Sequence, residues 1–475
     1  MIKIQEKKNV QTTEKNTDEK NGETKAGAVG KIVKQPEARQ ANRLQVQAGK
    51  QESATQENPT PDKPLYIGID LALKTNYVVI LDAAGKKQAA FSIANDSIGA
   101  KSLRNKLVSL IEAQAITSLG IGMEATNIYW WHLHQYLSQD KILNALCKVA
   151  VYTINPKLIK QFKKSFSKLD KTDPIDAYVI AQRVRFGNLT ETTMIDEIYE
   201  PLKRLTRFRF HLVENLIAEK NYLLTSLFLK YSSWQKIKPF SNVCGKTASE
   251  IIADMDMEEV AKLPIAELVE KVLTLSKGTI ANPEKTARLI KQVAEESYEV
   301  KEFMKEPLDL ILTNTYENIK YFQGKITSLD DVIEKELKRY PNTLMSIPGI
   351  GMVFAAGIIS EIGSLSHYPS EKHVASYAGL SWSKYQSGEF TGEHTHMKQG
   401  NQYLRYYLVQ AANSLRIHNE AYKSYYHKKY EEVPIHKHKR ALVLTARKLV
   451  RLLYAMLRDK RLYTKEMEEG KKKKG

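Results

Sequence analysis

The sequence predicts a mixed α/β domain early in the chain, followed by two regions built mainly of helices. Between about residues 65 and 154, short apolar runs of strand length alternate with segments of helical periodicity. From about Leu202 onward, apolar residues recur almost entirely at helical spacing. A length of 475 residues also exceeds what one compact core usually holds, so we expect two or three domains.

The predicted sheet begins at Leu65, where the apolar pattern becomes strong. A hairpin is indicated by Asp82–Gly85, whose turn residues separate the second and third apolar runs. The order β-β-β-α-β-α-β-α predicts a mixed sheet flanked by helices, which is the ribonuclease H-like plan. The expected strands are Leu65–Asp70, Tyr77–Leu81, about Gln88–Ile93, Ser118–Met123 and Lys148–Ile154, with a helix over Ile128–Leu137.

The second region predicts a long helical arm. From Leu312 to Ile333 the apolar residues mostly alternate three- and four-residue steps, which is typical of a coiled-coil seam. We expect two long antiparallel helices separated by an irregular helical insertion near residues 234–298. An ordinary helical bundle fits the periodicity equally well. The first of the two helices carries five leucines on one face: Leu205, Leu212, Leu216, Leu223 and Leu227.

Shifts in composition indicate the domain boundaries. Residues 1–62 are polar and charged with almost no aromatic residues, which predicts a disordered leader. We expect the sheet domain over 63–195, the coiled-coil arm over 196–340 and a helical C-terminal domain over 341–465. Residues 466–475 predict a basic, solvated tail.

The charge balance points to nucleic acid as a partner. A formal net charge of +18 indicates a polyanionic partner, either nucleic acid or an anionic membrane surface, and the membrane is disfavoured because no apolar run is long enough to span it. We therefore expect no membrane partner. Cys147 and Cys244 are far apart in sequence, which excludes a disulfide framework or a zinc site and suits a reducing cytoplasm.

Four acidic residues occupy positions where a ribonuclease H-like fold needs carboxylates. Asp70 ends the first predicted strand and Glu124 ends the fourth. Asp173 and Asp176 lie at the start of a predicted helix, one turn apart on nearly the same face. Pro174 at the first helical position would make Asp173 the N-cap residue.

Carboxylates that converge in this way repel one another unless cations lie among them. Hard oxygen ligands favour Mg²⁺ or Mn²⁺, which can activate a nucleophile and stabilise a leaving oxygen in phosphoryl transfer. Each acid alone could be a turn former or a helix cap, but their joint placement in a basic protein favours catalysis. Sugar and acetate kinases share a Gly-Ile-Asp strand, but the glycine-rich phosphate loop that they need is not found here.

The C-terminal domain contains two segments suited to phosphate contact. Ile347–Gly351, followed by an apolar helix, resembles a helix-hairpin-helix turn, in which Gly349 and Gly351 would let backbone N–H groups approach a phosphate. A glycine-rich turn between two packed helices is an equally good interpretation. A basic helix over residues 398–416 supplies Lys398 and Arg405 as expected backbone contacts, whereas its tyrosines suit a core.

These motifs together resemble the IS110 insertion-sequence transposases, a family understood as bridge-RNA-guided recombinases with a RuvC-like N-terminal domain. The matching blocks follow the family's order and cover most of the chain from Leu65 onward. The N-terminal blocks are Tyr66-Ile-Gly-Ile-Asp70, Gly122-Met-Glu-Ala-Thr126, Ile154-Asn-Pro156 and Lys171-Thr-Asp-Pro-Ile-Asp-Ala177. The C-terminal blocks are Ser346-Ile-Pro-Gly-Ile-Gly351, Tyr377-Ala-Gly-Leu380, Ser387-Gly388 and Lys398-Gln-Gly-Asn401 through Leu404-Arg405.

The resemblance implies a specific nucleophile. It places the family's catalytic serine at Ser387, which would attack a DNA phosphodiester and form a phosphoserine link that conserves the bond for rejoining. It also implies Asp70, Glu124, Asp173 and Asp176 as the family's DEDD metal ligands, and adds Asn401 to the expected nucleic-acid contacts.

The same resemblance implies the partners. These are donor and target DNA, a structured non-coding guide RNA and further copies of the chain in a prokaryotic cytoplasm. Because exchange of two duplexes needs several active sites, a dimer or tetramer is expected. Two other hypotheses stay open: a metal-dependent endonuclease or Holliday-junction resolvase in which water attacks, and a non-enzymatic nucleic-acid scaffold with a degenerate nuclease fold.

Overall fold

The computed structural model describes residues 62–125, 127–166, 172–189, 197–255, 257–382, 386–387, 390–391 and 400–465. The expected leader, except Asp62, and the expected basic tail lie outside these residues. Within the described part, none of the helices combines the length and the apolar character that crossing a membrane requires.

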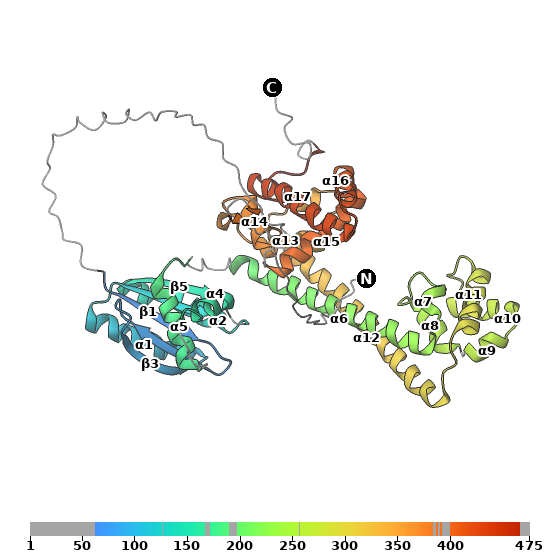
Figure 1. Ribbon diagram of the computed structural model, residues 1–475, viewed down its shortest axis with the longest axis horizontal. Coiled ribbons are helices and arrows are strands. Elements are labelled where there is room, and N and C mark those ends of the chain that lie inside the picture. Colours follow the sequence, from blue (N-terminus) through green and yellow to red (C-terminus); the bar gives the residue numbers. More distant parts are fainter. Residues whose placement is uncertain are drawn as a thin grey trace, which may run out of the picture. The chain divides into compact units, whose positions relative to one another are not determined.

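The first domain contains one five-stranded sheet. Its strands are β1 (Pro64–Asp70), β2 (Thr75–Leu81), β3 (Lys87–Ala94), β4 (Ser118–Glu124) and β5 (Lys148–Ile154). They lie in the order β3-β2-β1-β4-β5. Figure 1 shows β1 between β3 and β5 in this sheet. β1 is antiparallel to β2 and parallel to β4, so the predicted mixed α/β sheet is confirmed, with strand limits within two residues of the predicted ones.

Five helices accompany the sheet: α1 (Ser97–Gln114), α2 (Trp130–Ser138), α3 (Lys141–Leu146), α4 (Pro156–Lys163) and α5 (Asp173–Phe186). The sequence interpretation did not include α3. This short helix forms because Asp140 accepts hydrogen bonds from the backbone N–H groups of Ile142 and Leu143, both at 3.0 Å. The prediction of one helix between the fourth and fifth strands was therefore wrong.

The two faces of β1 contact different helices. Leu65, Ile67 and Ile69 are buried in a core shared with α1 and α2. The opposite face carries Gly68, where an added Cβ would overlap the backbone of Ala177 and Ala181 in α5. The absence of a side chain at Gly68 therefore allows α5 to lie directly against the strand.

The middle of the chain is helical. It comprises the 3₁₀ turn Glu197–Tyr199, α6 (Glu200–Lys230), α7 (Trp234–Ile237), α8 (Lys246–Asp254), α9 (Met257–Lys262), α10 (Ile265–Ser276), α11 (Pro283–Glu296) and α12 (Glu302–Leu337). α6 and α12 lie side by side and antiparallel, because Arg209 pairs with Asp330 while Lys230 pairs with Asp309. The shorter helices pack around a core that includes Leu227 of α6.

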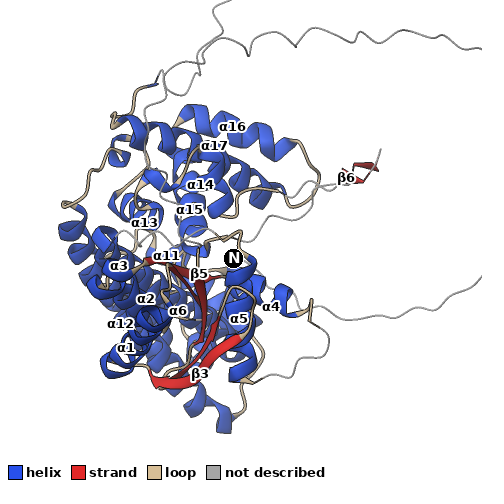
Figure 2. Cartoon of the chain, turned by 90° about the vertical axis from the view of Figure 1, so that its left-hand side faces the viewer, coloured by secondary structure: helices blue, strands red, loops and turns tan. Residues whose placement is uncertain are grey.

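The C-terminal region is helical, as predicted, apart from one short pair of strands (Figure 2). Its elements are two 3₁₀ turns (Leu344–Ser346 and Leu365–His367), α13 (Met352–Ile362), α14 (Glu371–Tyr377), β6 (Gln386–Ser387), β7 (Phe390–Thr391), α15 (Gln402–His418), α16 (Glu420–Glu431) and α17 (Lys437–Asp459). Their core extends beyond this region, because Leu202 of α6 and Ile333 of α12 are fully buried in it.

Replacing Gly68 by alanine is expected to destabilise the protein. The new methyl group must displace α5, and overpacking of this kind costs about 1–3 kcal/mol of unfolding free energy. Chemical denaturation of the full chain measures the change. Gly324→Ala is the matched control, since Gly324 is an exposed position of α12 with open space around it and should gain about 0.5–1 kcal/mol. Equal effects at both positions would contradict the close contact.

Candidate functional site

Two of the four predicted acids end neighbouring strands. Asp70 is the last residue of β1 and Glu124 is the last residue of β4. The parallel register places Ile69 opposite Met123, so the two acids follow one step later at the same edge of the sheet. That edge, where parallel strands present their carboxyl ends, is a usual place for sites in open α/β sheets.

The other two acids lie in the first turn of α5. The helix begins at Asp173, and its N-cap is Thr172. The prediction that Asp173 is the N-cap was therefore wrong by one residue, because the Thr172 carbonyl already accepts hydrogen bonds from the N–H groups of Ile175 and Asp176. Asp173 and Asp176 remain close to the positive end of the helix dipole, which favours negative charge.

The other three acids lie near enough to Asp70 for their charges to act on it. The pKa of Asp70 is raised to about 6, first by burial and then by the negative charges of Asp176, Asp173 and Glu124. The backbone N–H of Leu71 donates a hydrogen bond that acts in the opposite direction. The structure thus brings together all four acids that the sequence singled out.

Lys163 is a member of this site that the sequence analysis missed. It is the last residue of α4, and its Nζ lies 2.5 Å from Oδ1 of Asp176. Its ammonium group neutralises part of the negative charge in the cluster. No spacing rule links Lys163 to Asp176, because the contact depends on how α4 packs against α5.

The donor set suits a divalent cation in its chemistry. All four side chains offer hard oxygen ligands, and their mutual repulsion at Asp70 is the kind that a bound cation relieves. Among the described residues, however, no group of three or more His, Cys, Asp or Glu side chains is arranged to hold one ion. The acids are gathered in one electrostatic site without forming a finished coordination shell.

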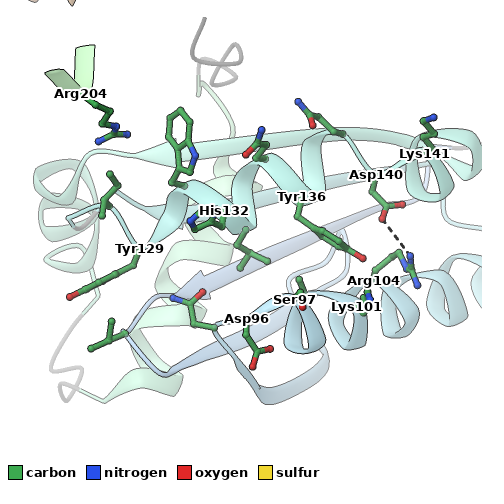
Figure 3. A pocket seen from close by; sticks show the side chains of 18 residues that line it. Asp96, Ser97, Lys101, Arg104, Tyr129, His132, Tyr136, Asp140, Lys141 and Arg204 are labelled. Carbon is green, nitrogen blue, oxygen red and sulfur yellow. Dashed lines mark ion pairs between the residues drawn. The ribbon is translucent and has the colours of Figure 1, made fainter. Parts of the chain in front are cut away.

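A groove in the first domain lies away from the acids. This groove of about 1160 Å³ is lined by α1 and α2, and Arg104 and Asp140 face each other in it at 3.9 Å (Figure 3). Tyr136 and Trp131 give it a largely apolar wall. None of the four acids lines this groove, so the groove and the acid cluster are separate features of the domain.

Ser387 lies in the short strand β6. Its backbone pairs with Phe390 of β7, and Gln386 pairs with Thr391 in the same antiparallel register. Gly388 and Lys398, two other residues of the predicted motifs, lie outside the described residues.

Both ends of the segment that contains Ser387 are fixed at one place. The backbone N–H of Asn401 donates to the Tyr377 carbonyl at 2.6 Å. An added Cβ at Gly400 would overlap the backbone of Gly379, so these two glycines are in close contact. Gly379 and Gly400, which flank residues 381–399 in the sequence, therefore lie side by side.

Asn401 has a structural role in this anchor. Its Oδ1 accepts hydrogen bonds from the first N–H groups of α15, and its Nδ2 donates to Glu361 at 2.7 Å and to Tyr377 at 3.0 Å. Glu361 is buried and also accepts hydrogen bonds from Nε and Nη2 of Arg207 in α6, at 2.6 and 2.9 Å. The amide of Asn401 is thus fully engaged within the protein.

The remaining predicted contacts differ in their surroundings: an added Cβ at Gly349 would lie 3.2 Å from Cβ of His418, whereas the space at Gly351 is open. Gly349 adopts a φ of +93°, which favours glycine, and Gly351 is the N-cap of α13 with no side-chain cap. The first N–H groups of α13 therefore keep no side-chain acceptor. Arg405 is half-buried on α15.

Replacing Asp70 by asparagine is expected to stabilise the protein at pH 7.5 in EDTA. The folded protein holds the Asp70 proton up to about pH 6, whereas an unperturbed carboxyl releases it near 3.8, so ionisation at neutral pH opposes folding. Partial solvation reduces the effect to about 1–2 kcal/mol. The advantage of the variant should disappear as the pH falls to about 4. Thermal unfolding across this pH range measures it.

Asp82 supplies a control of opposite sign. Hydrogen bonds from the Lys86 N–H and the Gln88 side chain lower its pKa, so Asp82→Asn should lose stability at pH 7.5.

Adding Mg²⁺ or Mn²⁺ should raise the melting temperature of the native protein more than that of Asp70→Asn. Equal responses to the metal would contradict a role of Asp70 in cation binding.

Two models of transposase families match the chain, one in each half. A family model described as a transposase matches residues 67–231, and a model of the IS116/IS110/IS902 transposase family matches residues 342–427. An uncharacterized 44.8 kDa protein of insertion element IS116 from Streptomyces clavuligerus is 23% identical over 405 residues, covering 84% of this chain and 96% of the relative.

Two further relatives extend the comparison. An uncharacterized 42 kDa protein of insertion element IS900 from Mycobacterium paratuberculosis is 23% identical over 412 residues, 84% of this chain and 97% of the relative. The pilin gene-inverting protein of Moraxella bovis is 30% identical over 162 residues, 33% of this chain and 50% of the relative. The two family models span the acid cluster and the segment that contains Ser387, and the chain belongs to the IS110/IS116 family of insertion-sequence transposases.

Proposed function

We propose that this chain cuts and rejoins DNA through a phosphoserine intermediate, with Ser387 as the nucleophile. The observation that carries the proposal is the gathering of Asp70, Glu124, Asp173 and Asp176 at one sheet edge, in a family of DNA-rearranging enzymes. The likeness to a pilin gene-inverting protein supports recombination rather than simple cleavage. In this proposal the first domain has a ribonuclease H-like, RuvC-type fold, and α6 and α12 form a coiled-coil arm.

The proposed step conserves the phosphodiester energy. Ser387 Oγ forms a bond to phosphorus, the bond from phosphorus to one DNA oxygen breaks, and that oxygen gains a proton. The proton of the serine hydroxyl passes to a carboxylate of the acid cluster. Reversal of these events with a different DNA hydroxyl rejoins the strand.

The four acids would hold Mg²⁺ or Mn²⁺ near the reacting phosphate. Such ions, when bound, stabilise the negative charge that develops on the phosphate oxygens. Asp173 and Asp176 are oriented by α5, and Lys163 holds Asp176 in place before the cation arrives. We propose that the acids act on the serine of another subunit in a dimer or tetramer.

Phosphate contacts are proposed for the C-terminal region. Gly349 and Gly351 precede uncapped N–H groups at the start of α13, and Arg405 and Lys398 supply positive charge. The engaged amide of Asn401 supports a different role for that residue, namely holding the ends of the Ser387 segment together.

The serine mechanism predicts a covalent adduct. The native protein, incubated with Mg²⁺ and labelled DNA of the element's ends, should form a protein–DNA species that survives denaturing electrophoresis, and Ser387→Ala should not. Ser381→Ala is the control, because the Ser381 hydroxyl is buried without a hydrogen-bond partner in the described part. Strand exchange by Ser387→Ala would instead support the metal-dependent nuclease or resolvase. If Asp70→Ala and Glu124→Ala left every function of the protein intact, the non-enzymatic nucleic-acid scaffold would be supported instead.

The guide-RNA proposal predicts a specific nucleic acid in the purified protein. The net charge of +18 and the membership in the IS110/IS116 family support it. Purification from the native host, followed by sequencing of copurified RNA, should recover one structured RNA encoded beside the gene. A random sample of cellular RNA, removable without loss of strand exchange, would contradict guidance.

A further inference from the structure

The helix α17 carries a stripe of arginines along one face. Its sequence contains seven Lys and Arg residues and one Asp. Arg440, Arg447, Arg451 and Arg458 are separated by seven, four and seven residues, which places them within about 40° of one another around the helix and along about 27 Å of its length. None of these residues belongs to the sites that the sequence predicted.

The outer two arginines of the stripe are already paired. Arg440 lies 3.1 Å from Glu432, and Arg458 lies 2.8 Å from Asp459. Carboxylates of the protein itself therefore neutralise the charges of Arg440 and Arg458.

The inner two arginines differ in this respect. Within the described residues, neither Arg447 nor Arg451 forms an ion pair, and Nη1 of Arg447 is shielded from solvent without a hydrogen-bond partner. Burial and the neighbouring positive charge of Arg451 lower the pKa of Arg447, while Glu371 of α14 attracts it without reaching ion-pair distance. The Nη1 atom of Arg447 is shielded from water without a hydrogen-bond acceptor, and the charge of Arg451 repels the guanidinium group. An anion bound to both arginines would supply the missing acceptor and offset the repulsion.

We propose that Arg447 and Arg451 together bind one backbone phosphate of a nucleic acid strand. Two guanidinium groups one helical turn apart supply parallel N–H donors that match phosphate oxygens better than ammonium groups do. The exposed Arg451 would meet the phosphate first, and Arg447 would complete its buried side. The site rests on the proposed function only in taking nucleic acid as its ligand, so a missing Ser387 adduct would leave it unaffected.

The experiment compares full-length variants in a binding titration. Fluorescence anisotropy is measured with a labelled duplex DNA of mixed sequence and, separately, with an RNA hairpin of equal length, over a series of KCl concentrations. Arg447→Gln with Arg451→Gln should weaken binding by roughly tenfold and reduce the slope of log affinity against log salt by about 0.9, as expected for one lost phosphate contact. Loss on DNA, on RNA or on both supports the site and identifies the strand.

Two controls make the result decisive. Arg440→Gln and Arg458→Gln remove the same charge from the same helix face, but their arginines are paired, so their effect on the slope should be clearly smaller. Arg447→Gln should keep or raise the melting temperature, because it removes a partly buried charge that forms no ion pair in the described part of the chain. An unchanged slope on both probes, equal effects of the control variants or a lowered melting temperature of Arg447→Gln would each overturn the proposal.

Discussion

The close contact of α5 with β1 is the constraint on which the acid cluster depends. A side chain at Gly68 would push the helix away from the strand and separate Asp173 and Asp176 from Asp70 and Glu124. The contact therefore forces like charges together, and the raised pKa of Asp70 shows the free energy stored there. Lys163 relieves part of the repulsion. The fold accepts a local loss of stability in order to keep a strongly negative site, which is a common feature of sites that bind cations.

A second constraint organises the C-terminal region. The buried carboxylate of Glu361 joins Arg207 of the arm to Asn401 at the start of α15, and Asn401 in turn fixes the base of the segment with Ser387. A buried carboxylate bound on both oxygens is costly to disturb, so the anchor is rigid even though the segment that it holds is long. Both constraints hold groups together through close packing: the contact at Gly68 keeps the acids of α5 near those of the sheet, and Glu361 keeps Asn401 near Arg207.

The sequence predicted much of the sheet domain, because alternating apolar runs and turn residues are local signals. All five strands and the four acids could be found in this way, whereas the close approach of α5 at Gly68 became visible only in the structure. The ion pair of Lys163 with Asp176, the short helix α3 and the engaged amide of Asn401 were missed. These features depend on which elements meet in three dimensions, or on a single capping side chain. The same holds for Arg447, whose unusual state is a property of its surroundings.

The shared core of α6 and the C-terminal helices also sets the order of events during protein synthesis. Leu202 is made early, but its packing partners extend to Met456, about 250 residues later in the chain. At typical rates of translation, α6 must wait for roughly 12 to 50 seconds before this core can close. Until then the core around Leu202 lacks the helices that complete it, although α12 can already pack against α6. Only complete copies of the gene can therefore supply a folded C-terminal region.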